Sequence, residues 1–205
     1  MKPREPIPWL KLLVQAPFWA LFVAYVMQSY CFYNLLSWAP LYFHDAFPAS
    51  KGWVFNVVPW LVSFVFNIVC GYTSDWMVKS GCSTTFVRKF FAALMFLGTA
   101  VFSLMLNSVE TFKQALFVMS LNLGFTAFNS CSTTINAADL APRHAGALHG
   151  FMNSAGAFAG FLGVYLTGYI LETTGKWSSV FALTSGSALV GFLSYQLFGS
   201  GERIV

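Results

Sequence analysis

Six apolar runs divide this sequence, and each is long enough to cross a membrane as a helix. They cover approximately residues 17–41, 53–71, 88–107, 113–136, 144–170 and 177–198. A helix of about 20 residues spans the ~30 Å of hydrocarbon in a bilayer. Charged residues make up 9% of the 205 residues, against roughly 25% in a soluble domain. We therefore expect an all-α, multi-pass integral membrane protein. The connections are short, so residues 1–205 should form one six-helix unit embedded in the lipid bilayer.

Lysine and arginine are distributed unequally between the two sides of these runs. If the runs alternate in direction, one side carries Lys2, Arg4, Lys11, Lys79, Arg88, Lys89, Arg143 and Arg203. The other side carries Lys51, Lys113 and Lys176. Basic loops stay in the cytoplasm, so both termini are expected there. The net charge of +4 is modest and forms no basic run, so no nucleic acid partner is expected.

The four cysteines do not indicate a cross-linked or metal-binding protein. Cys31, Cys70 and Cys131 fall inside apolar runs, and Cys82 lies in a loop. No C-x-x-C spacing occurs, so the sequence suggests neither a disulfide framework nor a zinc site. We predict no metal and no cofactor.

One apolar run carries a regular set of uncharged polar side chains. On a continuous helix the set lies within roughly 80° of arc. Its members are Asn122, Thr126, Asn129, Thr133 and Asn136. Such groups do not face lipid, because they would lose their hydrogen bonds. The stripe therefore either lines a transport path or makes hydrogen bonds to neighbouring helices.

A second polar face lies in the first apolar run. Tyr30, Tyr33 and Asn34 share one side of a helix at spacings of three and four residues. Aromatic rings stack on a planar ligand, and an amide can hydrogen-bond its edge. These three residues are substrate candidates together with the stripe.

The fifth run is rich in small residues at about heptad spacing. These are Gly146, Gly150, Asn153, Gly156, Gly160 and Gly163. Small residues at this spacing let another helix backbone approach closely. We favour tight static packing over a sliding surface.

Asp75 lies at the end of the second run, where a carboxylate opposes the helix dipole. Arg88, Lys89 or the start of the run at 144 could compensate for it. The result would be a latch that holds one conformation. The alternative is an ordinary solvated acid.

Two motifs resemble a known family. Gly71-x-x-x-Asp75 followed by Lys79, Arg88 and Lys89 resembles a loop signature of the major facilitator superfamily. Asp139-Leu-Ala-Pro-Arg143-His-Ala-Gly146 is similar to a motif of its anion–cation symporter family, solute carrier family 17. The expected gating residues are those of these motifs: Gly71, Asp75, Arg88, Lys89, Asp139 and Arg143.

The resemblance covers almost the whole chain but corresponds only to helices 7–12 of that fold. It implies one half of a transporter, with the N-terminal half as a missing partner. Family members carry organic anions into secretory vesicles or lysosomes by alternating access, driven by membrane potential. The segments 52–61 and 168–177 are most similar to nucleotide-carrying members, so a nucleotide is the expected substrate and chloride a further candidate ligand. Gln28 stands where glutamate carriers have arginine, which argues against glutamate.

Several alternatives stay open. Phosphate, sialic acid or another organic anion could replace the nucleotide as substrate. A truncated chain could instead regulate a full-length transporter without transporting anything itself. The sequence has no G-x-x-x-x-G-K-[ST] loop, so neither ATP-driven pumping nor any enzymatic activity is expected.

Overall fold

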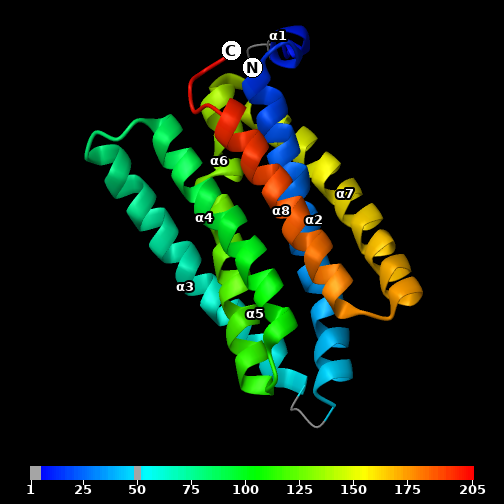
Figure 1. Cartoon of the computed structure of the whole chain (residues 1–205). Coiled ribbons are helices and arrows are strands. Elements are labelled where there is room, and N and C mark those ends of the chain that lie inside the picture. The colour runs from blue at the N-terminus through cyan, green and yellow to red at the C-terminus, as the bar shows by residue number, and fades with distance from the viewer. Residues whose placement is uncertain (1–5, 49–51) are drawn as a thin grey trace.

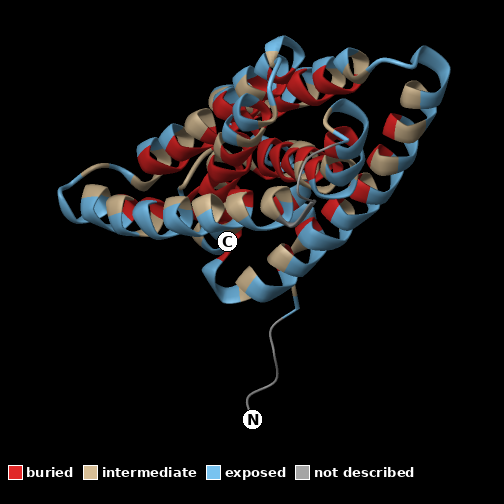
Figure 2. Ribbon diagram, turned by 90° about the horizontal axis from the view of Figure 1, so that it is seen from below, coloured by how far each residue is buried: buried red, intermediate tan, exposed pale blue. Residues whose placement is uncertain are grey.

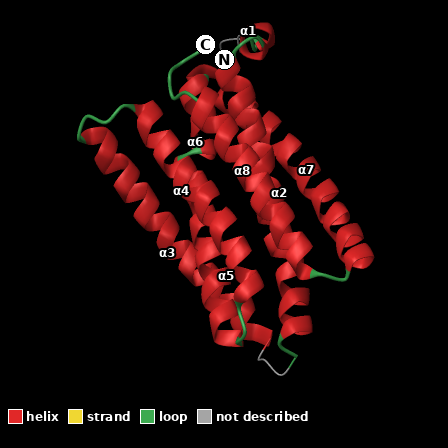
Figure 3. Cartoon of the chain, viewed as in Figure 1, coloured by secondary structure: helices red, strands yellow, loops and turns green. Residues whose placement is uncertain are grey.

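The computed structural model describes residues 6–48 and 52–205, and within them every regular element is helical (Figures 1 and 3). The expected all-α class is therefore confirmed. The α-helices are α1 (Trp9–Leu13), α2 (Ala16–Ala46), α3 (Gly52–Lys79), α4 (Thr84–Met105), α5 (Phe112–Thr126), α6 (Thr133–Leu140), α7 (Ala145–Thr174) and α8 (Trp177–Phe198). Three short 3₁₀ helices are η1 (Leu106–Ser108), η2 (Ala127–Cys131) and η3 (Pro142–His144).

The helices form a bundle of rods joined by short connections. The rods are α2, α3, α4, the composite α5–η2–α6, α7 and α8 (Figure 1). α1 and residues 199–205 lie at the same end of the bundle, as do the junctions between α3 and α4 and between α6 and α7. The basic residues Lys79, Arg88 and Arg143 belong to this end. The bundle thus gathers these three basic residues at one end, as the alternating pattern predicts, while Lys2 and Arg4 lie outside the described residues.

Four helical segments of the described residues are long and apolar enough to cross a membrane. They are Val54–Lys79, Thr84–Ser108, Pro142–Thr174 and Trp177–Phe198. α2 has 31 residues, but its tyrosines, tryptophans and amide side chains lower its mean hydropathy. The remaining rod is interrupted, and neither α5 nor α6 is long enough alone.

The rod expected as one helix over 113–136 is broken. α5 ends at Thr126, η2 follows, and Ser132 has φ −118° and ψ −95° before α6 begins. Hydroxyl side chains bond the local backbone here: Ser130 Oγ donates to Ala127 O (2.8 Å) and Ser132 Oγ to Phe128 O (2.9 Å). Such bonds weaken or bend a helix. The polar stripe is therefore not one continuous helix face.

Helix ends follow local sequence signals. Ser83 caps α4 by accepting from Phe86 N (3.3 Å). Thr111 and Gln114 form a capping box at the start of α5, which satisfies amide groups that a helix start leaves unpaired. Gly175 ends α7 with φ +62°, a conformation that glycine adopts without strain.

The core lies between the rods, while α3 and α7 present long exposed sides (Figure 2). α2 packs against α7 and α8, α4 packs against α8, and α3 packs against α5. The exposed sides of α3 and α7 are apolar and aromatic, with Phe64, Phe161 and Tyr165 more than half exposed. In water such surfaces would mark interaction sites; in a bilayer they can face lipid or another helical unit.

One cysteine pair departs from the sequence expectation. Cys70 of α3 and Cys131 of η2 are joined as a disulfide, with their Cα atoms 6.4 Å apart. The two residues are separated by 61 positions in the sequence, so only the packing of α3 on η2 brings them together. Cys31 and Cys82 are free thiols.

Candidate functional site

A buried arginine connects four elements near the end of the bundle that carries α1. Arg88 of α4, 7% exposed, donates to Asp139 of α6 through Nε (2.7 Å to Oδ2) and Nη2 (3.3 Å to Oδ1). Its Nη1 donates to Ser74 Oγ of α3 (3.3 Å) and to the Cys131 carbonyl of η2 (3.1 Å). We call these groups the Arg88 cluster. A bidentate arginine–carboxylate pair with further bonds keeps both buried charges compensated.

The latch predicted around Asp75 stays a prediction. α3 continues to Lys79, so Asp75 lies inside a helix and is exposed. Among the described residues, Arg88 is paired with Asp139. Lys89 instead donates to Gln196 O (2.9 Å), and Gln196 Nε2 donates back to Lys89 O (2.7 Å).

The other two gating candidates lie on α3 and η3. Gly71 is half-buried in α3, and a Cβ added there would meet no atom within 4 Å. Arg143 is exposed in η3. The structure thus brings together Arg88 and Asp139 from the set predicted by sequence.

The C-terminal segment closes over the same end of the bundle. Asn136 Nδ2 donates to Ser200 O (2.9 Å), and Gly201 N donates to Thr85 Oγ1 (2.9 Å). Ile204 N donates to Leu140 O (2.8 Å). A Cβ at Gly201 would come within 2.8 Å of Thr85 N, so this close approach requires glycine.

Most of the candidate substrate residues are buried inside the bundle. Asn122 Nδ2 donates to Ser103 Oγ (3.0 Å), which links α5 to α4. Tyr30 and Thr167 share a hydrogen bond (3.3 Å) between α2 and α7, and Asn34 Nδ2 donates to Tyr30 O (3.0 Å). Thr126, Thr133 and Asn136 are also buried. In this structure these six side chains are sequestered between helices.

Tyr33 and Asn129 are the two candidates that keep partial exposure. Tyr33 lies on α2 and borders an open hollow of about 500 Å³ against α7. Asn129 lies in η2, directly before Ser130. They are the members of the predicted set that a solute could reach.

The glycines of α7 divide into two groups. A Cβ at Gly156, Gly160 or Gly163 would overlap Ser29, Tyr33 or Tyr30 of α2, respectively. At Gly146 and Gly150 it would meet nothing within 4 Å. Asn153 accepts a hydrogen bond from Tyr25 OH (3.4 Å). The middle of α7 is therefore the part that needs small residues in order to receive α2 side chains.

An exposed aromatic face joins α2 to α3. Phe32 lies 5.6 Å from Tyr33 and 6.1 Å from Trp60, measured between ring centroids. Further along α3, Ser130 Oγ of η2 lies 2.9 Å from Asn67 Oδ1, beside a second open hollow of about 510 Å³ that Trp60 also borders. We call these five residues, with the two hollows, the aromatic face.

Sequence reasoning did not include Trp60, Asn67 or Ser130 in the site. Trp60 and Asn67 are seven residues apart, so they share one face of α3. That seven-residue spacing could have indicated that Trp60 and Asn67 lie on the same side of the helix. Their partners Phe32 and Ser130, however, come from two other elements, which periodicity within one run does not show.

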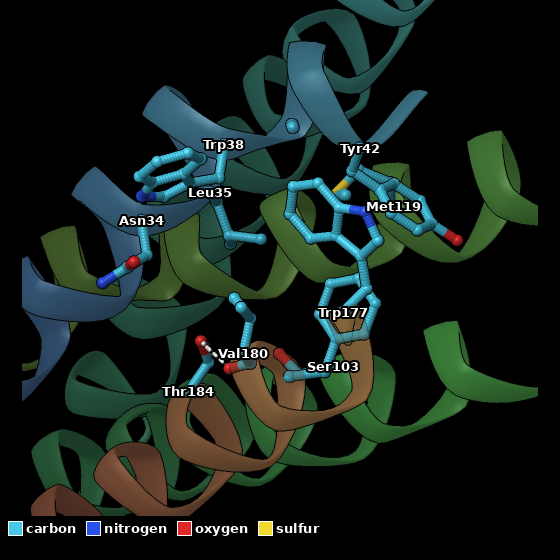
Figure 4. A pocket seen from close by; sticks show the side chains of 11 residues that line it. Asn34, Leu35, Trp38, Tyr42, Ser103, Met119, Trp177, Val180 and Thr184 are labelled. Carbon is cyan, nitrogen blue, oxygen red and sulfur yellow. Dashed lines mark hydrogen bonds between the residues drawn. The ribbon is translucent and has the colours of Figure 1, made fainter. Parts of the chain in front are cut away.

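A small, partly open cavity also lies between α2, α4, α5 and α8 (Figure 4). Its volume is about 20 Å³, and Leu35, Trp38, Trp177 and Val180 line much of it. A cavity of this size holds about one water molecule, whereas sites for organic ligands measure roughly 300–1,000 Å³. The open aromatic face, and not this cavity, has room for an organic solute.

The chain is similar to known proteins. A family model described as Major Facilitator Superfamily matches residues 1–164. The chain belongs to the major facilitator superfamily.

Individual relatives cover nearly all of the chain. The voltage-gated purine nucleotide uniporter SLC17A9 of Mus musculus is 38% identical over 198 residues, which is 97% of this chain and 44% of that protein. The Homo sapiens protein of the same name is 37% identical over 198 residues, 97% of this chain and 45% of that protein. The chloroplastic ascorbate transporter of Arabidopsis thaliana is 37% identical over 209 residues, 100% of this chain and 38% of that protein.

These relatives confirm the family resemblance drawn from the two motifs. Their names describe a purine nucleotide uniporter and an ascorbate transporter. The chain spans less than half the length of each of them.

Proposed function

We propose that this chain is one six-helix half, helices 7–12, of an alternating-access transporter for organic anions, with a purine nucleotide as its substrate. The six rods each cross the bilayer, including α2 and the interrupted α5–η2–α6. Polar interruptions at membrane depth are tolerated where the backbone is buried in protein or lines a cavity. The α1 end faces the cytoplasm because the basic residues gather there. The membrane is that of a secretory vesicle or a lysosome.

The observation that carries the proposal is the aromatic face. It is open, it borders hollows of about 500 and 510 Å³, and it combines rings with uncharged polar groups. Rings such as Tyr33 and Trp60 can stack on a purine, while Asn67 and Ser130 can bond its edge or a sugar. None of the five residues is basic, so the second half of the transporter would supply the cations for the phosphates.

A second six-helix half is the partner that would complete the site. Transporters of this architecture bind substrate at the midplane between two repeats. Exposed apolar sides on α3 and α7 flank the aromatic face and provide surfaces for that contact. Membrane potential would drive uptake, since each charge crossing ~100 mV contributes about 2.3 kcal/mol. A multiply charged nucleotide therefore gains several times that amount.

The substrate test uses a chimera in which this chain replaces the matching half of the mouse relative. ATP uptake is measured in liposomes with an imposed potential. We expect Tyr33→Leu to reduce uptake by about tenfold, because a stacking contact is worth 1–3 kcal/mol. Tyr72→Leu is the matched control: Tyr72 lies on α3 and is 81% exposed, away from the aromatic face. Equal uptake by the two variants would remove Tyr33 from the site.

Two further experiments test the substrate class and the need for a second half. Competition of uptake by ATP, phosphate, ascorbate and sialic acid identifies the anion class, and stronger competition by a non-nucleotide would replace the purine in the proposal. Reconstitution of this chain alone, under the same potential, tests whether it is half a transporter. We expect no ATP uptake, and robust uptake by the chain alone would contradict the need for a second half.

A further inference from the structure

The disulfide between α3 and η2 lies at an unusual position in the bundle. Cys70 is 1% exposed and Cys131 is 7% exposed, so bulky reagents cannot reach either sulfur. Cys131 is the last residue of η2, directly before the break at Ser132. The covalent bond therefore attaches the interrupted rod to α3 at the point where its helical geometry fails.

The same two elements are already held together by Arg88. Its Nη1 donates to Ser74 Oγ on α3 and to the Cys131 carbonyl on η2. Ser74 lies one helical turn after Cys70. The disulfide thus adds a covalent connection beside a non-covalent one, at the same contact. The Arg88 contact consists of hydrogen bonds alone, whereas a disulfide persists until it is reduced.

We propose that Cys70 and Cys131 form a reversible redox site, oxidised by a peroxide and reduced by a thiol, that locks η2 onto α3. A peroxide is small enough to reach buried sulfur. One thiolate attacks a peroxide oxygen, giving a sulfenic acid and releasing hydroxide. The second thiol then attacks that sulfur, forming the S–S bond and releasing water. Overall, two thiols and one hydrogen peroxide give one disulfide and two water molecules, with two electrons passing from sulfur to peroxide.

The first experiment maps the thiols of the purified full chain in detergent. The protein is fully reduced, desalted and treated with hydrogen peroxide. It is then denatured in the presence of N-ethylmaleimide, which labels free thiols. Its peptides are analysed by mass spectrometry. We expect Cys70 and Cys131 to lose maleimide labelling together and to appear in one linked peptide that lacks two hydrogens. Dithiothreitol should restore both thiols, while Cys31 and Cys82 should appear in no linked peptide.

Variants sharpen the assignment. Cys131→Ser should leave Cys70 labelled after peroxide, and Cys70→Ser should leave Cys131 labelled. Cys82→Ser, a matched change at a free cysteine, should leave the linked peptide unchanged. Full labelling of both Cys70 and Cys131 after peroxide, or oxidation that dithiothreitol does not reverse, overturns the redox site.

The second experiment tests the lock itself by hydrogen exchange. Amides of residues 127–136 should exchange about tenfold more slowly in the oxidised chain than in the reduced chain, because local opening of η2 requires separation from α3. The amides of α8 are the internal comparison and should not change. Equal exchange rates over 127–136 in both redox states overturn the lock. Neither readout depends on transport, so failure here is distinguishable from failure of the proposed function.

Discussion

Alanine at Gly163 gives a direct test of the packing between α7 and α2. A Cβ at this position would overlap the ring of Tyr30. That ring is 7% exposed and shares a hydrogen bond with Thr167, so it cannot move aside freely. Overpacking of this kind costs about 1–3 kcal/mol, and loss of the Tyr30–Thr167 bond adds about 1 kcal/mol. Alanine recovers about 1 kcal/mol of helix propensity. The net loss of unfolding free energy should be about 2 kcal/mol.

Gly150→Ala is the matched control on the same helix. A Cβ at Gly150 meets nothing within 4 Å, so the substitution should stabilise the protein by about 0.5–1 kcal/mol through helix propensity. The two variants should therefore differ by nearly 3 kcal/mol in sodium dodecyl sulfate unfolding of the micelle-embedded chain, followed by circular dichroism. In a double-mutant cycle, Tyr30→Ala should remove most of the effect of Gly163→Ala. If Gly163→Ala is as stable as Gly150→Ala, or if the two sites show no coupling, the overlap is not a real constraint.

Two further stability predictions use the same unfolding assay. Arg88→Met should lower the free energy of unfolding by about 3–5 kcal/mol, because it leaves the Asp139 carboxylate without its buried partner. Lys89→Met, which removes one partly exposed hydrogen bond, should lower it by about 1 kcal/mol. Similar losses for both variants would contradict the importance of the Arg88 cluster. Asn122→Leu should cost about 1–3 kcal/mol by breaking the bond to buried Ser103. Adding Ser103→Ala should restore part of that loss, and a strictly additive double variant would argue against the bond.

Features that depend on nearby residues were predictable from the sequence. Apolar runs predicted some helices closely: α4 and α8 match the runs at 88–107 and 177–198, whereas α3 continues to Lys79, well past the run at 53–71. The spacing of Gly156, Gly160 and Gly163 marked a close helix contact, because a helix repeats every 3.6 residues. It did not show that a Cβ at Gly146 or Gly150 would meet no atom within 4 Å, since that depends on how other helices pack around the start of α7.

Features that depend on distant partners were not predictable. Arg88 and Asp139 are 51 positions apart, and Cys70 and Cys131 are 61 apart. Periodicity shows that Asn122 shares a face with later residues only if the helix continues unbroken. The hydroxyl groups of Ser130 and Ser132 end that continuity by bonding backbone carbonyls. The serines that interrupt the helix are visible in the sequence, but a count of apolar residues does not include the effect of their hydroxyl groups.

The broken rod and the buried arginine satisfy each other's unpaired groups. An interruption at membrane depth exposes backbone carbonyls that lipid cannot hydrogen-bond. A buried guanidinium has five N–H donors, and one carboxylate can accept hydrogen bonds from only some of them. Arg88 gives two donors to Asp139 and a third to the Cys131 carbonyl, beside the break. Removing the arginine would therefore leave the Cys131 carbonyl without this donor and the Asp139 carboxylate with a single long bond from Asn136 Nδ2 (3.4 Å), whereas restoring a regular helix would leave the guanidinium short of an acceptor. The break at Ser132 and the charge at Arg88 are thus best understood as one structural unit.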